Sequence, residues 1–377
     1  MANTFFSDMI DPKYNMAFLD LTGIQRTEPE TPAGTAERAA APERAVDRYS
    51  AEKLVVISDL HMGCGPRDDL AQNGRLLIDM LEGHYLTQGW HLVLNGDIEE
   101  VLRYPFSAIR SQWTRLFDVF DSFASRKRLC KTIGNHDEDL VFEKNYPYRL
   151  YNAVRVETSH LPLYVYHGHQ SSRVYTDYNN LVRNGIRYVL KPFGIRNISA
   201  ARNPHRRFFV EKQAYDFAIK HNCISVIGHT HRALFESLGR FDYIKYEIER
   251  FCRDYPAAAG TEKSQIKSDV AALREDLGKL KRSERRDVLR QSLYGDDLPV
   301  PCLFNSGSAI SRKGITALEL DNDSISLVYW FTEGNEKKFI SRGNYKITRL
   351  KGTRQRRAVL NQDRLDYIKA KIELLGS

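Results

Sequence analysis

The chain has 377 residues, 42% of them hydrophobic and 28% charged, which is enough to bury a large core and excludes fibrous and fully disordered proteins. No apolar run approaches the roughly 18 residues of a membrane-spanning helix, and Asp8, Asp11 and Asp20 interrupt the start of the chain, where a signal peptide would be apolar. We therefore expect a cytoplasmic protein. Its five cysteines are scattered and include no Cys-x-x-Cys pair, so we expect reduced core residues rather than disulfides or a thiolate zinc site.

The net charge of +8 is unevenly distributed. Residues 173–212 carry nine Lys or Arg against two acidic residues, and residues 336–377 carry twelve against four. Such segments favour anionic partners, namely phosphate esters, nucleic acid or acidic head groups. Nucleic acid is thus a candidate partner through both segments, and a solvated basic surface is the alternative for each.

Residues 1–49 are expected to form a disordered leader, because residues 27–47 are rich in Ala, Pro, Glu and Thr and contain no aromatic side chain. A domain over residues 50–335 is expected to follow. Residues 336–377 are expected to form a basic tail.

Within the expected domain, short apolar runs alternate with helical patterns over residues 70–81 and 107–126. This alternation predicts a layered α/β fold. Residues 315–320 and 325–331 alternate around a polar turn and predict an antiparallel hairpin. Buried strands are predicted at residues 53–58, 91–95, 128–133, 163–166 and 224–227.

A charged helical insertion is expected over residues 240–298. Within it, residues 261–293 carry an apolar seam of Ile266, Val270, Leu273, Leu277 and Leu280, at spacings of four and three residues. Packing of this helix on its own domain is the favoured interpretation, and a homodimer contact is the alternative.

Each predicted strand is followed by side chains that commonly bind metals. Asp59 and Asp97 are 38 residues apart, as are Asp97 and Asn135, which leaves room for a strand, a crossover helix and loops. Successive motifs therefore return to one edge of the sheet, where open α/β sheets bind ligands. The motifs are Asp59-Leu60-His61, Gly96-Asp97-Ile98-Glu99-Glu100, Gly134-Asn135-His136-Asp137, His167-Gly168-His169 and Gly228-His229-Thr230-His231.

The spacing inside these motifs also suits metal binding. Residues i and i+2 of an extended segment point to the same side about 6.5–7 Å apart, so two such ligands can converge on one cation or flank a pair of cations. Mixed imidazole, carboxylate and amide donors favour Mn, Fe or Zn over calcium. A glycine before a ligand allows close approach of the backbone.

The five motifs, in this order, resemble those of the calcineurin-like metallophosphoesterases, whose pattern is D-x-H, G-D, G-N-H-D/E, H and G-H-x-H. The resemblance covers about residues 54–331, and Asn305-Ser306-Gly307-Ser308 resembles a further segment of the family. It implies an α/β sandwich of two mixed sheets flanked by helices, here with a helical, basic cap insertion. It also implies two divalent metal ions, with Mn favoured and Fe or Zn as alternatives.

Carried over residue by residue, the resemblance implies one metal held by Asp59, His61, Asp97 and His231. It implies a second metal held by Asp97, Asn135, His167 and His229, so that Asp97 bridges the pair. Because a carboxylate has two oxygens and a negative charge, it suits a position between two cations.

The implied reaction is attack of a metal-bridging hydroxide on a phosphorus atom. The leaving group then needs a proton, and His136 has the chemistry of a general acid. Glu100 or Asp137 is expected to hydrogen-bond the other ring nitrogen of His136. His169 is outside the ligand pattern and is expected either behind the ligands, facing the substrate, or in solvent.

Departures from the family patterns narrow the class. Protein Ser/Thr phosphatases carry G-D-x-V-D-R-G, and purple acid phosphatases have Tyr where this chain has Glu100, so neither branch is expected. The long insertion after His169 and the ending His231-Arg232 are similar to UDP-diacylglucosamine pyrophosphate hydrolases. Those enzymes carry Arg where this chain has His136.

Residues 172–213 are expected to form the basic cap between two ligand motifs. Arg173, Arg206 and Arg207, interleaved with aromatic residues, are candidates to bind an anionic substrate, because Arg holds phosphate by paired hydrogen bonds. An amphipathic helical segment with ordinary core aromatics is the alternative.

The sequence thus favours a binuclear metal-dependent phosphoesterase acting on a phosphate ester or pyrophosphate bond. A non-catalytic interaction protein of the same fold, as a retromer scaffold subunit is thought to be, is one alternative. A nuclease of the same superfamily is another, and it would use the basic segments to bind its substrate. The residues leave open the substrate, the bond type and the native metal.

Overall fold

The computed structural model describes most of the expected domain and the C-terminal segment. Side chains at positions 171, 204–209, 276 and 279 lie outside this description. The described residues are 9, 15–22, 47–65, 68–171, 204–235, 248, 251–252, 255–256, 258–279, 300, 302–310, 313–321 and 323–375.

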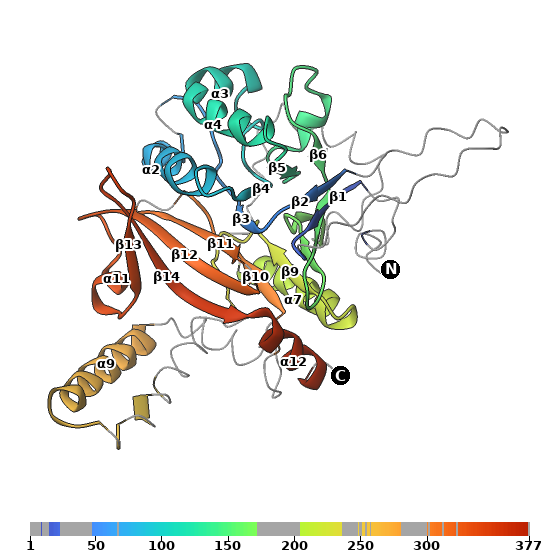
Figure 1. The fold of residues 1–377 in the computed structure, drawn as a ribbon. Helices are drawn as coiled ribbons and strands as arrows, with labels where there is room; N and C mark the ends of the chain where they lie inside the picture. Colours follow the sequence, from blue (N-terminus) through green and yellow to red (C-terminus); the bar gives the residue numbers. More distant parts are fainter. Residues whose placement is uncertain are drawn as a thin grey trace.

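Two mixed β-sheets form the centre of the molecule (Figure 1). The larger sheet has the order β13 (Lys346–Arg349), β14 (Gln355–Arg364), β12 (Ser324–Thr332), β11 (Ile315–Asp321), β3 (Lys53–Ile57), β4 (His91–Asn95), β5 (Leu129–Thr132) and β6 (Leu150–Tyr151). The smaller sheet has the order β10 (Leu303–Asn305), β9 (Ile224–Ile227), β8 (Leu163–Val165), β7 (Ala153–Glu157), β1 (Met16–Asp20) and β2 (Arg48–Ser50).

The strands β3 to β6 of the larger sheet are parallel, and β11, β12, β14 and β13 continue it in antiparallel fashion. Parallel strands need crossover connections, which here carry helices. These are α2 (Gly74–Met80) with the π-helical turn η1 (Leu81–Leu86), and then α3 (Phe106–Gln112) with α4 (Thr114–Ala124).

Alternation along the strands divides the core into two layers, because successive side chains of a strand point to opposite faces. In β3, Leu54 and Val56 belong to the cluster that also contains the smaller sheet, α7 (Pro204–Lys220) and α12 (Leu365–Leu375). Val55 and Ile57 belong to the cluster under α2, η1 and α4. The expected α/β sandwich of two mixed sheets flanked by helices is confirmed.

The buried strands predicted from apolar runs are present as β3, β4, β5, β8 and β9, and the predicted hairpin is β11–β12. The helix predicted over residues 107–126 is divided at Trp113, whose backbone (φ −110°, ψ 27°) ends α3 and precedes α4. The indole Nε1 of Trp113 donates to the carbonyl oxygen of Gly63 at 3.0 Å and to Asp68 Oδ2 at 2.8 Å. The residue that separates α3 from α4 is therefore also held by tertiary hydrogen bonds of its side chain.

Two segments expected outside the domain contribute to its sheets, so the boundaries at residues 50 and 335 are wrong for them. Within the expected leader, β1 pairs with β7 over five residues, and the short apolar run Met16–Asp20 has a mostly buried pattern. Within the expected tail, β14 pairs with β12 along its length, from Thr332↔Gln355 to Ser324↔Arg364. Each strand is stabilised by a partner far away in the chain, which local composition does not reveal.

The remaining helical elements lie outside the sheets. They are the 3-10 helices η2 (Glu138–Phe142) and η3 (His169–Ser171), and the α-helices α9 (Gly260–Lys279) and α11 (Lys338–Arg342). Ile266 on α9 is buried, and it lines a cavity of about 350 Å³ together with Phe251 and Tyr255. Leu280 and residues 172–203 of the expected cap lie outside the described residues.

No helix within the described part of the chain is long and apolar enough to cross a membrane. All five cysteines are free. Cys130, Cys223 and Cys302 are buried as expected, whereas Cys252 is exposed and Cys64 is half-buried.

Candidate metal centre

The expected ligands gather where the carboxyl ends of strands from both sheets meet. Asp59, Asp97, His167 and His229 each stand two residues after the end of β3, β4, β8 and β9 respectively. Backbone hydrogen bonds align the loops: His61 N donates to Asp97 O at 3.0 Å within the larger sheet. Between the sheets, His229 N donates to Asp59 Oδ2 at 3.1 Å.

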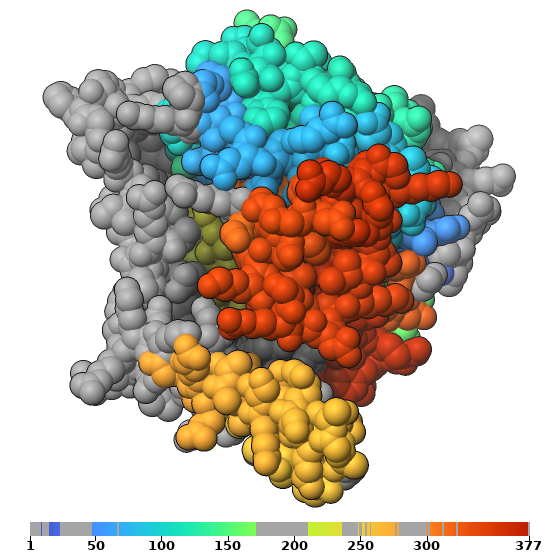
Figure 2. All heavy atoms as spheres, turned by 90° about the vertical axis from the view of Figure 1, so that its left-hand side faces the viewer, coloured from blue at the N-terminus to red at the C-terminus, as the bar shows by residue number. Residues whose placement is uncertain are grey.

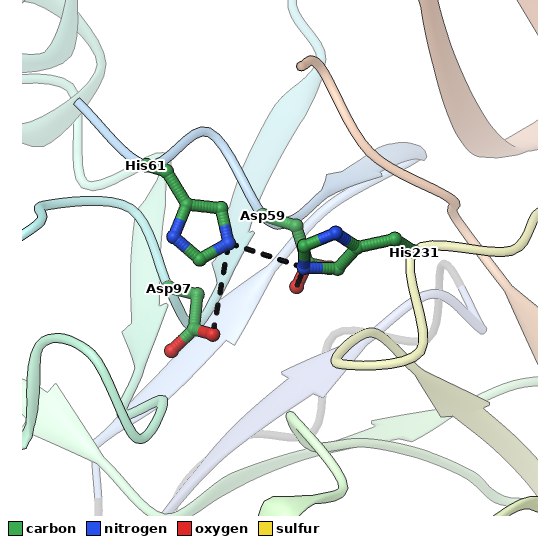
Figure 3. Close-up of side chains that lie close together, drawn as sticks. All are labelled: Asp59, His61, Asp97 and His231. Atoms are coloured by element: carbon green, nitrogen blue, oxygen red, sulfur yellow. Dashed lines mark hydrogen bonds and ion pairs between the residues drawn. The ribbon is translucent and has the colours of Figure 1, made fainter. Parts of the chain in front are cut away.

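His61, Glu100 and His136 form one group of possible donors at this edge. Two further groups share Asp97. One consists of Asp59, His61, Asp97 and His231, with ligand atoms that all lie within 4.8 Å of one another (Figure 3). The other consists of Asp97, His167 and His229, under the same limit. The cluster can therefore hold a divalent metal.

In the first group, the rings of His61 and His231 face each other through Nε2 atoms that are 3.1 Å apart. The Nδ1 atom of His61 lies 3.1 Å from Glu100 Oε2, and because a carboxylate accepts hydrogen bonds, this contact assigns the proton to Nδ1. The lone pair on Nε2 is then turned towards His231 Nε2, which also lies 3.1 Å from Asp59 Oδ1. A cation between these atoms would relieve the repulsion between the His61 lone pair and the neighbouring acceptor atoms.

The second group repeats this pattern. His167 Nδ1 lies 2.9 Å from the carbonyl oxygen of Asn95, so it carries the ring proton and Nε2 offers a lone pair, 3.2 Å from Asp97 Oδ2. Neither His167 Nε2 nor Asn135 Oδ1 forms a hydrogen bond with the described residues, although both are buried. Unsatisfied buried polar atoms are costly, and a cation would satisfy both.

The electrostatics of the centre also favour a cation. Burial raises the pKa of Asp97, but His167, His136 and His61 outweigh it and hold the pKa well below its usual value, so the carboxylate is ionised. Burial lowers the pKa of His167, but Asp97 and Asp59 outweigh it and raise the pKa to about 9. The negative potential at this ring attracts positive charge, which a divalent ion can supply as well as a proton.

Backbone strain is concentrated at the same residues. Outside glycine, seven described residues have a positive φ, and five of them are Asp59, His61, Asp97, His229 and His231. Such conformations cost of order 1–3 kcal/mol each and persist where the surrounding structure imposes them. The close packing of these loops also requires glycine at position 134, because a Cβ there would lie 2.2 Å from the Asp97 nitrogen.

His136 lies at the rim of the centre. Its side chain is 24% exposed, its backbone nitrogen donates to Asp97 Oδ1 at 2.8 Å, and its Nδ1 lies 2.9 Å from Glu100 Oε1. Burial lowers the pKa of His136, but the carboxylates of Asp97 and Glu100 outweigh it and raise the pKa to about 9. Glu100 thus contacts His136, which is one of the two expected alternatives, and it also contacts His61.

Asp137 does not contact His136 in this way, so that alternative is wrong. Its carboxylate instead accepts from Gly134 N at 2.6 Å and Ile98 N at 2.9 Å, and pairs with Lys131 Nζ at 2.8 Å. Lys131 also pairs with Glu99, and all three side chains are fully buried. This network ties the loop after β4 to the loop after β5, because Asp137 binds the backbone of both.

Two features of the centre were not predicted from the sequence: the buried Lys131, and the hydrogen bonds by which Asn305 holds a ligand-bearing loop. A charged residue inside the buried strand β5 (Leu-Cys-Lys-Thr) was a usable signal, because a lysine is rarely fully buried unless paired. Asn305 Nδ2 donates to Gly228 O and to Thr230 Oγ1, both at 2.9 Å, which fixes the loop that carries His229 and His231. Ser306 Oγ lies 2.8 Å from Ser58 Oγ, which donates to Asp59 Oδ2.

His169 is buried beside the second group, so its expected placement in solvent is wrong. Its ring centroid is 5.4 Å from that of His167 and 6.3 Å from that of His229. Burial, together with His167 and His229, lowers its pKa well below the usual value, which keeps the imidazole neutral.

The three arginines expected to bind substrate are not brought to the centre by any described contact. Arg173 lies outside the described residues, and Arg206 and Arg207 fall on α7 at positions whose side chains lie outside them. Arg232, which directly follows His231, is engaged with the buried Glu211: its Nε donates to Glu211 Oε1 at 3.2 Å. Substrate binding by the three arginines therefore stays a prediction.

No model of a known protein family and no curated protein sequence matches the chain. Among solved structures, it is similar to Yfce, a phosphoesterase from E. coli, with 15% identity, a TM-score of 0.32, and coverage of 73% of this chain and 91% of that one. A predicted phosphoesterase from Streptococcus pneumoniae has 11% identity, a TM-score of 0.27, and coverage of 74% and 88%. A Vps29 from Entamoeba histolytica has 10% identity, a TM-score of 0.31, and coverage of 75% and 94%. Similarity at this level assigns no function to the chain.

Proposed function

We propose that this chain is a metal-dependent phosphoester hydrolase of the calcineurin-like metallophosphoesterase kind. The observation that carries the proposal is the pair of donor groups that share Asp97. In each group an imidazole Nε2 faces other acceptors, while its Nδ1 is engaged by Glu100 or by the Asn95 carbonyl oxygen. Such fixed tautomers are typical of metal-binding histidines.

The residues present fit two divalent ions. Asp59, His61, Asp97 and His231 would hold one, and Asp97, Asn135, His167 and His229 the other, with Mn favoured over Fe or Zn. Bound there, the ions would lower the pKa of a water molecule and neutralise the charge of phosphoryl oxygens. Nitrogen, carboxylate and amide donors without thiolate are compatible with this group of metals.

The chain's own contribution to the reaction is orientation and proton transfer. Glu100 holds His136 through Nδ1, which leaves Nε2 as the nitrogen that donates a proton to the leaving oxygen. Glu100 holds His61 at the same time, so one carboxylate orients a ligand and the acid. Phosphoryl transfer needs no nucleophilic side chain in this scheme.

The finer assignments are part of the proposal. The similarity to UDP-diacylglucosamine pyrophosphate hydrolases stays a prediction, because His136 stands where those enzymes carry Arg. Monoester, diester and pyrophosphate bonds are all candidates, since the residues that would select among them belong to the expected cap.

The test compares wild type with Asp97→Ala, and with Asp118→Ala as a control that removes an exposed carboxylate from α4. We expect about two equivalents of Mn in wild type and in the control by elemental analysis after dialysis. Asp97→Ala should lose metal and at least about 10³-fold of its turnover, because it is the ligand common to both groups.

The activity panel should contain phosphomonoesters, phosphodiesters, nucleoside pyrophosphates and polynucleotides, each with Mn, Fe or Zn. Full metal occupancy without turnover on any member would indicate an interaction protein and contradict the hydrolase. Equal metal content and equal turnover in Asp97→Ala and wild type would contradict both the metal centre and its role in hydrolysis.

A further inference from the structure

The C-terminal segment forms a strongly basic surface. We use the name basic ribbon for residues 333–357, which comprise α11, β13, the first residues of β14 and the turns between them. They contain nine Lys or Arg and two Glu, a net charge of +7. Every residue of this segment is described by the structure.

The ribbon lies at the free edge of the larger sheet, where β13 pairs only with β14 among the described strands. All four residues of β13 are exposed. Figure 2 shows the C-terminal segment, in orange-red, across the middle of one face of the molecule, between the α2 region above and α9 below. The surface is therefore open to a partner of considerable size.

Like charges are placed side by side on the ribbon. Arg349 lies directly opposite Arg356 in the β13–β14 pair, a cross-strand arrangement that is destabilising by itself. Glu333 Oε1 accepts a hydrogen bond from Arg356 Nη2 at 2.7 Å, while Arg354 Nη2 donates to the Glu333 carbonyl oxygen at 3.2 Å. Among these three arginines, only Arg356 forms a hydrogen bond with the Glu333 carboxylate in the described part of the chain, which leaves positive charge in excess.

Arg357 is balanced by Glu319, whereas four other cations of the ribbon are not balanced by described neighbours. Lys338, Arg342, Lys346 and Lys351 are exposed and form no ion pair with any residue in the described part of the chain. A lysine or two on an edge strand is sufficient to prevent edge-to-edge aggregation, so a solvated edge explains Lys346 alone. It does not explain cations on α11, on β13 and in the turn before β14 together.

The shape and chemistry of the ribbon favour nucleic acid over a lipid surface. The ribbon is the edge of the larger sheet and presents an open cationic surface, and arginine forks match phosphate oxygens. A helix or ribbon that binds membranes needs a continuous apolar face, whereas the ribbon exposes only Phe339 (41%) and Ile347 (44%) as large apolar side chains. An exposed aromatic ring among cations also suits stacking on bases.

The register relates the ribbon to the metal centre. In β11, Leu318 lies opposite Val56 of β3, and Ile315 lies in the row Ile315–Trp330–Arg357–Thr348 that reaches β13. Three strands, β11, β12 and β14, separate β3 from β13. Four strand spacings amount to about 20 Å across the sheet.

We propose that the basic ribbon binds the phosphate backbone of a nucleic acid. The binding does not depend on the metal centre, because no residue of the ribbon belongs to either donor group. It would therefore persist if the proposed hydrolase activity were absent.

The experiment measures fluorescence anisotropy of a short labelled DNA duplex, and of the corresponding single strand and RNA duplex, between about 50 and 200 mM salt. The test variant combines Lys346→Gln, Arg349→Gln, Lys351→Gln and Arg354→Gln, all exposed positions. The control removes the same charge elsewhere on the surface through Arg126→Gln, Lys127→Gln, Lys144→Gln and Lys220→Gln. Circular dichroism and thermal melting confirm that both variants fold.

For wild type we expect affinity for at least one of these nucleic acids to fall steeply with salt, by about 10³-fold across this range if roughly six phosphates are contacted. The ribbon variant should bind about tenfold or more weakly near 100 mM salt, with a salt slope reduced by about four, whereas the control should bind like wild type. Asp97→Ala should also bind like wild type.

Three results would overturn the proposal. They are no binding of any of the three nucleic acids by wild type, equal losses in the ribbon and control variants, and ribbon-dependent binding to vesicles of phosphatidylserine and phosphatidylcholine without binding to nucleic acid. The last result would assign the surface to an anionic membrane. None of these outcomes depends on metal content or turnover, so failure of the ribbon and failure of the hydrolase are separable.

Discussion

At the scale of single residues, Glu100 has an unusual position, because its carboxylate holds two histidines with different proposed tasks. Its Oε2 lies 3.1 Å from His61 Nδ1, and its two oxygens lie 2.9 Å from His136 Nδ1. Burial raises the pKa of Glu100, but hydrogen bonds from His136 and His61 outweigh it and lower the pKa to about 2. The group stays ionised over the whole physiological range and orients both rings.

The proposed acid can be separated from the ligands by the choice of leaving group. His136→Ala should slow hydrolysis of an alkyl phosphate or alkyl phosphodiester by about 10²–10⁴-fold, because the alkoxide needs a proton. Hydrolysis of the matching nitrophenyl ester should change far less, since nitrophenolate leaves without one. Steady-state kinetics with both esters measures the difference, and elemental analysis checks that metal content is retained.

His221→Ala provides a matched control, because it removes an imidazole just after α7, away from the donor groups. It should leave both rates unchanged. Equal losses of His136→Ala on the two esters would contradict the role as acid and indicate a role in positioning alone.

At the scale of elements, the buried network around Lys131 connects β5 with the loops that carry Asp97 and Asn135. Lys131, Glu99 and Asp137 are each fully buried, and Tyr146 OH donates to Glu99 Oε1 at 2.9 Å. Removing one partner of such a group leaves an uncompensated buried charge. The network therefore makes the geometry of the centre depend on an interaction that contacts no proposed metal ion.

Lys131→Met should lower the free energy of unfolding by about 3–5 kcal/mol, as measured by urea denaturation, because two carboxylates then lack their cation. Lys127→Met, an exposed neighbour, should change it by less than about 0.5 kcal/mol. Adding Glu99→Gln to Lys131→Met should recover part of the loss, since it removes one of the buried acids. A loss no larger than that of the control would contradict the structural importance of the network.

At the scale of the whole molecule, the donor groups join the two sheets. Asp59, His61, Asp97 and Asn135 follow strands of the larger sheet, whereas His167, His229 and His231 follow strands of the smaller one. The strained backbone at five of these residues also carries a cost in the folded state. Ions that bind these two donor groups would therefore stabilise the folded state as a whole.

Metal removal should accordingly destabilise the protein. With Mn at about 100 times its Kd, binding adds about 2.7 kcal/mol to the free energy of unfolding per site, and a chelator should remove this contribution. Thermal melting with and without chelator measures the effect for wild type and for Asp118→Ala. Asp97→Ala should show no shift; a shift equal to that of wild type would place the metal elsewhere.

The residues by themselves determined the candidate donor types, their order and the strands that precede them, because these depend on local patterns. Runs such as Lys53–Ile57 and His91–Asn95 are apolar and short, and polar donors follow each of them within two residues. Local patterns do not decide whether Glu100 or Asp137 contacts His136. Only folding decided it, because the loops after β4 and β5 turn those neighbouring carboxylates to different partners.

The tertiary structure alone decided the roles of the two ends of the chain. Met16–Asp20 and Gln355–Arg364 look unremarkable as isolated segments, and β14 carries three arginines among its apolar residues. Both become strands because β7 and β12 offer unpaired hydrogen-bonding edges and apolar faces far away in sequence. Such long-range pairing, like the burial of Lys131 between two acids, is a property of the assembled sheets, and no local pattern carries it.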